Sequence, residues 1–268
     1  KDGVKVSPLT ILEPVSKRNT GTTIEFKPNP QYFDSPKFSV SRLKHLLRAK
    51  AVLCPGLRVI FKNEHETNVE DQTTEWLYAE GLEDYLSMEL AGFEVLPSEP
   101  FTGAQSGPNE AVDWAVQWLP EGGQPLTESY VNLIPTGMGG THVNGFRTGL
   151  LEALREFCEF RNLLPRGLKI SGEDIWERCA YVLSAKMLDP QFAGQTKDRL
   201  NSRDIAGYIS SAVKDSFSLW LNQHTEEGQK LAEMAINKET CIKIPKSKKN
   251  RRGQPNPPQF ANQATLVN

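Results

Sequence analysis

Residues 139–158 read GGTHVNGFRTGLLEALREFC, two glycines followed by a long amphipathic segment. Its apolar residues recur every three or four positions, which is the spacing of one face of an α-helix. This packing stripe consists of Val143, Phe146, Leu150, Leu151, Leu154, Phe157 and Cys158. We expect the glycines to form a turn, Thr141 to cap the helix, and Pro165 and Gly167 to end it. The stretch predicts one long helix that covers a sheet.

Strands are predicted on both sides of this helix. Residues 129–134 before it are strand-like, and the apolar run 180–187 after it is typical of a buried strand. Alternating apolar residues at 57–61 and 112–118 indicate half-buried strands, whereas the Pro/Gly/Ser-rich residues 98–110 are typical of a connection. We expect a meander of antiparallel strands, a loop at 189–202 and a terminal helix with an apolar stripe from Ile205 to Trp220. The predicted fold class is α+β, with helices over one sheet.

The N-terminal part has a different character. Residues 1–35 are rich in proline around one short alternating run, 22–26, which we interpret as a strand that leaves something upstream. Ser39 is a suitable N-cap for a helix, and Pro55 with Gly56 stops that helix. Its basic face holds Arg42, Lys44, Arg48 and Lys50. A solvated face is favoured over a DNA-facing stripe for these cations.

Composition narrows the function classes. The 268 residues carry a net charge of −2 and a mean hydropathy of −0.47, values of an ordinary globular protein rather than of one that coats polyanions. Cys54, Cys158, Cys179 and Cys241 are scattered without metal-binding spacing, so we expect neither a metal site nor disulfides, and a cytoplasmic location. No apolar run approaches bilayer length. The chain begins at Lys1 rather than Met, which we interpret as an internal fragment of a longer protein.

The loop at 189–197, DPQFAGQTK, is the most informative candidate site. Loops that follow buried strands are where ligands usually meet open sheets. Gly194 permits close approach of the backbone, Gln195 supplies an amide donor, and Lys197 is a cation on a flexible stem, a set suited to a terminal phosphate. On these residues alone, an ordinary polar loop remains the favoured alternative.

Other candidates are weaker. The run 137–142, GMGGTH, could present N–H groups to a phosphate, but helix capping is the favoured interpretation because no P-loop lysine follows. We expect His142 to be structural, since no nucleophile motif accompanies it. Arg147 is a candidate DNA-facing residue, with a solvated helix face as the alternative. No catalytic centre is predicted.

Three segments together resemble the B subunits of bacterial topoisomerase IV, members of the type IIA, gyrase B-like topoisomerase family. They are residues 32–44 (YFDSPKFSVSRLK), 126–135 (LTESYVNLIP) with 139–145 (GGTHVNG), and 189–197. The likeness extends from about Lys17 to Ile236, and the first segment is closer to topoisomerase IV than to gyrase. At Lys27 the family often has tryptophan.

The resemblance implies a transducer domain with a left-handed βαβ crossover, the ribosomal-protein-like domain 2 fold, in which a mixed sheet is covered by helices. It divides the chain into the end of a GHKL ATPase lobe at 1–35, the transducer at 36–237, and a tail at 238–268. The tail is basic and then rich in Pro, Asn and Gln, and is expected to be disordered or to follow a frameshift, which the nucleotide sequence would test.

The resemblance also implies an ATP-dependent DNA topoisomerase that couples ATP binding and hydrolysis to strand passage, decatenation and relaxation in chromosome segregation. Lys197 and Gln195 match residues that contact the γ-phosphate, and Thr22 matches a threonine near the adenine. The implied cofactors are ATP and Mg²⁺ in the full protein, with none held by this segment, which is expected to be inactive alone. The implied partners are DNA, the A-type partner of topoisomerase IV and a second B-type protomer.

Two alternatives stay open. One is a gyrase B protein or another GHKL ATPase with the same transducer fold. The other is a non-enzymatic βαβ module that binds nucleic acid, because related folds occur in ribosomal proteins. Salt-dependent DNA binding without any response to ATP would favour the second.

Overall fold

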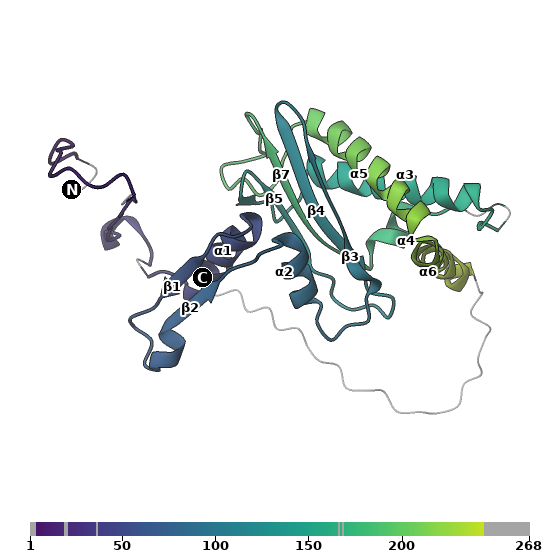
Figure 1. Ribbon diagram of the computed structural model, residues 1–268, viewed down its shortest axis with the longest axis horizontal. Helices are drawn as coiled ribbons and strands as arrows, with labels where there is room; N and C mark the ends of the chain where they lie inside the picture. Colours follow the sequence, from purple (N-terminus) through teal and green to yellow (C-terminus); the bar gives the residue numbers. More distant parts are fainter. Residues whose placement is uncertain (1–3, 19–20, 36, 166, 168, 244–268) are drawn as a thin grey trace. The chain divides into compact units, whose positions relative to one another are not determined.

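The computed structural model describes residues 4–18, 21–35, 37–165, 167 and 169–243. The chain forms two compact units, residues 1–79 and 80–268 (Figure 1). The boundaries predicted at residues 35/36 and 237/238 stay predictions.

The first unit is a helix beside a two-stranded sheet. After the 3₁₀ turn η1 (Pro30–Tyr32), α1 (Val40–Leu53) begins at Ser39, whose hydroxyl accepts a hydrogen bond from the Arg42 N–H at 3.4 Å. This confirms the predicted N-cap. Strand β1 (Val59–Lys62) pairs antiparallel with β2 (Thr73–Trp76), and η2 (Val69–Gln72) lies between them in the chain.

The strand predicted at residues 22–26 is wrong for the part of the chain that the structure describes. Thr22 to Phe26 are exposed and outside any strand. An alternating apolar pattern makes a strand only where a neighbouring strand completes its hydrogen bonds, and none of the described strands pairs with this run.

The second unit is built on a five-stranded sheet in the order β3-β4-β7-β5-β6. Its strands are β3 (Leu96–Ser106), β4 (Glu110–Trp118), β5 (Thr127–Val131), β6 (Ile134–Pro135) and β7 (Cys179–Met187). The predicted strands at 112–118 and 180–187 are confirmed. The connection predicted at 98–110 is wrong, because most of it belongs to β3, an edge strand, where proline is tolerated.

The sheet is mixed, not the antiparallel meander expected from the spacing of the strands. β5 and β7 are neighbours and run parallel, with the helix α3 (Thr141–Phe160) between them in the chain. The remaining pairs, β3 with β4, β4 with β7 and β5 with β6, are antiparallel. A parallel pair needs a crossover connection, and α3 provides it.

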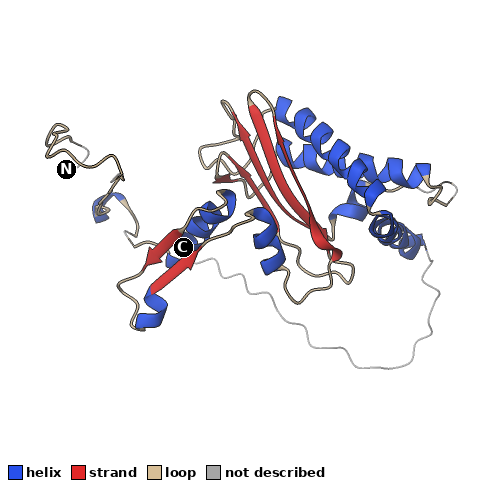
Figure 2. Cartoon of the chain, in the orientation of Figure 1, coloured by secondary structure: helices blue, strands red, loops and turns tan. Residues whose placement is uncertain are grey.

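Helices cover both faces of this sheet (Figures 1 and 2). α3 and α5 (Asp204–Gln223) pack on the face that carries Val112, Trp114 and Val116 of β4, with α4 (Gly172–Trp176) and α6 (Thr225–Lys243) beside them. On the opposite face lies α2 (Leu82–Glu89), whose Tyr85 hydroxyl donates to a Glu128 carboxylate oxygen at 3.1 Å.

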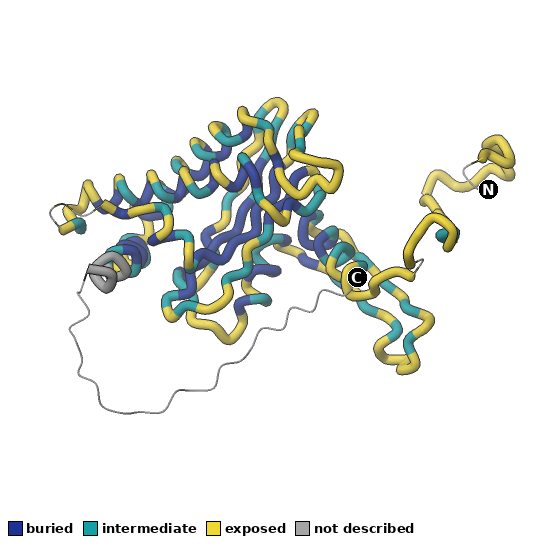
Figure 3. Tube along the Cα trace, turned by 180° about the vertical axis from the view of Figure 1, so that it is seen from behind, coloured by how far each residue is buried: buried dark blue, intermediate teal, exposed yellow. Residues whose placement is uncertain are grey.

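The double cover explains why β4 is buried on both faces rather than half-buried as expected. Figure 3 shows the buried segments concentrated along the strands and the inner sides of the helices. The α+β class predicted from the residue patterns is confirmed, and so is the mixed sheet covered by helices that the family resemblance implied.

Two glycines allow α3 and α5 to pack at unusually close range. A Cβ placed on Gly149 would lie 2.6 Å from the Ser210 carbonyl oxygen of α5, and one on Gly145 would meet the backbone of Ala206. Only hydrogen fits at these positions, so the two helices are in backbone contact.

α6 continues past the predicted boundary at residue 237 as far as Lys243. The rest of the predicted tail lies outside the described residues. Within the described part of the chain, no helix combines the length and the apolar character needed to cross a bilayer.

Candidate functional site

The loop between β7 and α5 is an ordered hairpin. The Ala193 N–H donates to the Arg199 carbonyl at 2.9 Å, and the Asn201 N–H donates to the Gln191 carbonyl at 2.8 Å. At the tip, the Lys197 N–H donates to the Gly194 carbonyl at 3.1 Å, which closes a tight turn. The loop predicted at 189–202 is therefore confirmed, and its backbone is fixed.

Lys197 and Gln195 both lie at this tip and are exposed. Lys197 has a φ of 59°, a left-handed conformation that costs a residue with a Cβ about 1 kcal/mol and is maintained by the turn. Its Nζ lies 5.8 Å from the centroid of the Phe192 ring, a cation–π distance. The tip thus presents a cation and an amide to solvent from a fixed backbone.

The base of the hairpin is joined to the glycine turn that precedes α3. Leu200, which is buried, donates its N–H to the Gly139 carbonyl at 3.0 Å and accepts from the Thr141 N–H at 3.1 Å. The Met138 N–H donates to the Asp198 carbonyl at 2.9 Å. These three bonds, called the loop seam below, make one structural unit of two motifs that are far apart in the sequence.

The seam requires glycine at position 140. Gly140 has a φ of 137°, and a Cβ there would lie 2.6 Å from the Leu200 nitrogen. Gly140 also occupies the N-cap position of α3, so the prediction that Thr141 caps this helix is wrong. The Thr141 N–H is used in the seam, and its hydroxyl is buried without a hydrogen-bond partner among the described residues.

His142 is fully buried at the start of α3. Its Nε2 lies 3.0 Å from the Thr136 hydroxyl oxygen, and burial lowers the pKa of the imidazole to about 4. The side chain is therefore neutral at pH 7 and faces the interior. This geometry supports the structural role expected from the sequence.

Arg147 is engaged within its own unit. It forms an ion pair with Glu173 at 2.7 Å and stacks over the Trp176 ring at 4.8 Å from the centroid. About a third of its side chain stays exposed (34%). Contact with DNA remains a prediction for this residue. Thr22 is exposed in the first unit, whereas Lys197, Gln195 and Arg147 belong to the second.

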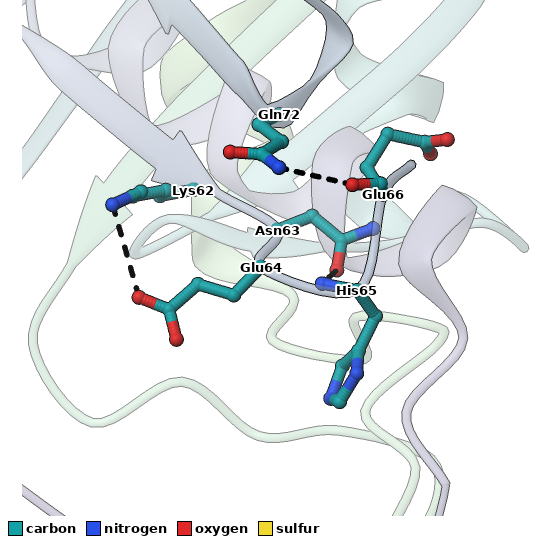
Figure 4. A network of polar contacts seen from close by, with 6 residues as sticks. All are labelled: Lys62, Asn63, Glu64, His65, Glu66 and Gln72. Atoms are coloured by element: carbon teal, nitrogen blue, oxygen red, sulfur yellow. Dashed lines mark hydrogen bonds and ion pairs between the residues drawn. The ribbon is translucent and has the colours of Figure 1, made fainter. Parts of the chain in front are cut away.

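The first unit has a hollow of its own, of about 760 Å³, that the sequence did not indicate. It is lined by Lys37, Phe38, Val40, Leu43, Phe61, Lys62, Asn63, Glu64 and His65. Figure 4 shows the polar contacts beside it, including Lys62 Nζ to Glu64 Oε1 at 3.8 Å and Gln72 Nε2 to the Glu66 carbonyl at 3.0 Å. These are surface contacts within one strand connection, and they do not gather buried polar groups.

Sequence reasoning missed three residues that support the loop: Ser129, Thr136 and Leu200. Ser129 and Thr136 belong to a short strand and its turn, where hydroxyl side chains are common and carry no spacing signal. Leu200 is an isolated apolar residue in a polar loop. That isolation was its only sign of burial.

Comparison with known proteins places the chain in a family. The DNA gyrase B family profile matches residues 81–250. The B subunit of DNA topoisomerase 4 from Salmonella typhimurium is 60% identical over 236 residues, covering 88% of this chain and 37% of the relative. Its counterpart from Escherichia coli K12 is 59% identical over 237 residues, again covering 88% of this chain and 37% of the relative.

A solved structure agrees. The topoisomerase IV ATP-binding domain of Francisella tularensis, in complex with a small-molecule inhibitor, superposes with a TM-score of 0.67 at 35% identity. The likeness covers 80% of this chain and 57% of that one. The chain spans little more than a third of the length of these two curated relatives, 37% in each case. It belongs to the DNA gyrase B family.

Proposed function

We propose that this chain is the transducer segment of the B protein of a type II DNA topoisomerase, which relays ATP binding to DNA strand passage. The observation that carries the proposal is the ordered, exposed tip of the β7–α5 loop with Lys197 and Gln195, in a chain of this family. The whole protein would act as topoisomerase IV, relaxing and decatenating DNA in chromosome segregation.

In this proposal the loop tip recognises the terminal phosphate of ATP. The mobile ammonium group of Lys197 donates N–H hydrogen bonds to the γ-phosphate oxygens, and the side-chain amide N–H of Gln195 donates beside it. A cation directed at the γ-phosphate distinguishes ATP from ADP, so engagement of the loop depends on the nucleotide state. The same charge stabilises the phosphoryl group as it is transferred.

The described residues fit this role as donors to a phosphate. Lys197 is exposed, and the seam fixes the backbone that carries it. No three His, Cys, Asp or Glu side chains gather to hold a metal ion within the described part of the chain.

The remaining contacts belong to the same proposal. Thr22 would lie near the adenine, and Arg147 would face DNA within the dimer cavity. The partners would be DNA, the A-type protein of topoisomerase IV and a second B-type protomer, in the cytoplasm of a bacterium. The predicted frameshift after residue 237 also remains a proposal, which the nucleotide sequence tests.

The test is a hybrid enzyme in which residues 17–236 of this chain replace the matched segment of the Salmonella typhimurium protein. We expect Lys197→Ala to lower ATP hydrolysis about a hundredfold, which corresponds to about 3 kcal/mol of transition-state stabilisation. Lys230→Ala, on the exposed side of α6, is the matched control and should leave the rate within about twofold.

Unchanged hydrolysis in Lys197→Ala would mean that the loop does not reach the phosphate. DNA binding that falls with salt and ignores ATP would then support the non-enzymatic nucleic-acid module.

A further inference from the structure

Three buried polar side chains lie directly behind the loop seam. They are Ser129 of β5, Thr136 in the turn after β6, and His142 in the first turn of α3. Their exposures are 7%, 2% and 0%. Polar groups buried this deeply persist only where specific hydrogen bonds compensate for lost water, so their partners identify what they hold in place.

Thr136 is the centre of this group. Its hydroxyl donates to the Ser129 carbonyl at 2.9 Å and lies 2.7 Å from the Ser129 hydroxyl, which also reaches the Thr136 carbonyl at 3.0 Å. The Thr136 N–H donates to the Ser129 carbonyl at 2.8 Å. The turn is thus fastened to β5 through both backbone and side chain.

The other side of Thr136 leads to the seam. Its carbonyl accepts the Gly139 N–H at 2.8 Å, and its hydroxyl meets His142 Nε2 at 3.0 Å. The Gly139 carbonyl then accepts from Leu200, at the base of the hairpin that carries Lys197. An unbroken series of hydrogen bonds therefore runs from the central sheet to the loop.

The hydrogen-bond geometry favours one tautomer of the imidazole. When the single proton of the Thr136 hydroxyl is donated to Ser129, the Thr136 oxygen accepts from His142 Nε2–H. Nδ1 is then the unprotonated nitrogen, and it has no hydrogen-bond partner among the described residues. A bare acceptor is a smaller loss than a buried N–H without a partner, so this tautomer fits the site.

We propose that Thr136 and His142 are positioning residues for the phosphate loop, which order the Gly139–Thr141 turn so that the seam holds Lys197 in place. The inference rests on the proposed function of Lys197. Thr136 and His142 would affect ATP hydrolysis only by holding the loop that carries Lys197, in addition to any effect that they have on the stability of the fold.

The first test uses hydrogen exchange in the 268-residue chain itself. Thr136→Val keeps the shape of the side chain and removes the hydroxyl. We expect it to accelerate exchange at the amides of Thr141 and Leu200 at least about tenfold, relative to amides in β4 and β7. Thr136→Ser should restore the parent pattern, because it returns the hydroxyl.

Two control variants separate a local effect from general loss of stability. Thr148→Val makes the same chemical change on α3, at a hydroxyl bonded to the Asn144 carbonyl at 2.9 Å, and should leave the seam amides unchanged. Leu154→Ala removes a core side chain and should accelerate exchange across the unit without preference for the seam.

The second test is a double-mutant cycle on ATP hydrolysis in the hybrid enzyme. Thr136→Val should lower kcat about tenfold with little change in KM, since the loop contacts only the terminal phosphate. In the Lys197→Ala background it should have no further effect, because the group that it positions is gone. Leu154→Ala, which reduces the active fraction, should lower the rate by the same factor in both backgrounds.

The outcomes are distinguishable. The proposal is supported if Thr136→Val accelerates hydrogen exchange selectively at the seam amides and if its effect on kcat is not additive with that of Lys197→Ala. Equal effects of Thr136→Val in both backgrounds, or seam amides that exchange as in the parent, overturn it and leave the proposed function standing. A Lys197→Ala enzyme with the parent rate overturns the proposed function and, with it, the catalytic part of this inference.

Discussion

Replacing Gly140 with alanine should destabilise the second unit and release the loop seam. Gly140 combines a φ of 137° and a ψ of −157°, a backbone region that is essentially restricted to glycine. An added Cβ would also lie 2.6 Å from the Leu200 nitrogen, which is closer than any relaxed contact. The backbone must therefore leave its present conformation.

The size of the effect follows from these two losses. Adopting the glycine-only conformation costs a residue with a Cβ about 1–3 kcal/mol. Moving Leu200 away breaks the bonds from the Thr141 N–H to Leu200 and from the Leu200 N–H to Gly139, each with a net contribution of about 1 kcal/mol. Partial relaxation reduces the sum, so we expect the free energy of unfolding to fall by about 3 kcal/mol.

Urea denaturation of the chain, followed by tryptophan fluorescence, measures this change. Trp114 and Trp118 are buried in the second unit and report on its unfolding. With a slope of about 2 kcal/mol/M, a loss of about 3 kcal/mol lowers the midpoint by about 1.5 M. The slope itself should stay unchanged, because the variant alters the stability of the fold rather than the surface exposed on unfolding.

Two glycines of the same unit serve as controls. Gly137 lies in the same turn with open space around its Cβ position, so Gly137→Ala should change the stability by less than about 0.5 kcal/mol. Gly207 lies on an open side of α5, where alanine should stabilise the helix by about 0.5–1 kcal/mol. A Gly140→Ala variant as stable as Gly137→Ala would refute the reasoning.

Three further outcomes are expected. Burial lowers the pKa of His142 from 6.5 in the unfolded chain to about 4 in the folded state. The free energy of unfolding should therefore be highest above pH 6.5 and should fall by about 3 kcal/mol as the pH is lowered to 4. His142→Gln should remove this part of the pH dependence, as measured by urea titrations at pH 4 and 7. Gly149→Ala should force α3 from α5 and lower the thermal midpoint by several degrees, and an unchanged midpoint would contradict the backbone contact. Arg147→Ala loses the Glu173 ion pair and the stacking on Trp176, both partly exposed, and should cost about 1 kcal/mol by urea denaturation.

Elements with a strong internal period were predictable from the sequence. The α3 stripe, the strands at 112–118 and 180–187, and the Ser39 cap all follow from spacing within one segment. The loop at 189–202 could be located because it separates two such segments. From residue chemistry alone an ordinary polar loop was favoured over a phosphate site at Lys197, and the family resemblance reversed that preference. The role of Lys197 stays a prediction.

Features that depend on a contact with a distant part of the chain were not predictable from local spacing. Strand β3 carries Pro97, Pro100 and Gly103, a turn-like composition that only its edge position permits. The parallel pairing of β5 with β7 is set by the crossover, whereas alternation within a strand does not encode its neighbour. Threonine is a common N-cap residue, but here the Thr141 N–H donates to the Leu200 carbonyl, and Gly140 occupies the N-cap position.

The close glycine contact between α3 and α5 has a mechanical meaning. Backbone contact at Gly145 and Gly149 makes the two helices a single stiff arm about 30 Å long. The β7–α5 loop is attached to this arm twice at the same end, through the chain at Asp204 and through Leu200 at the start of α3. At the far end Phe157 lies against Gly228 of α6. A displacement of the loop would therefore shift both helices together, and α6 would be the next element to feel it at their far end.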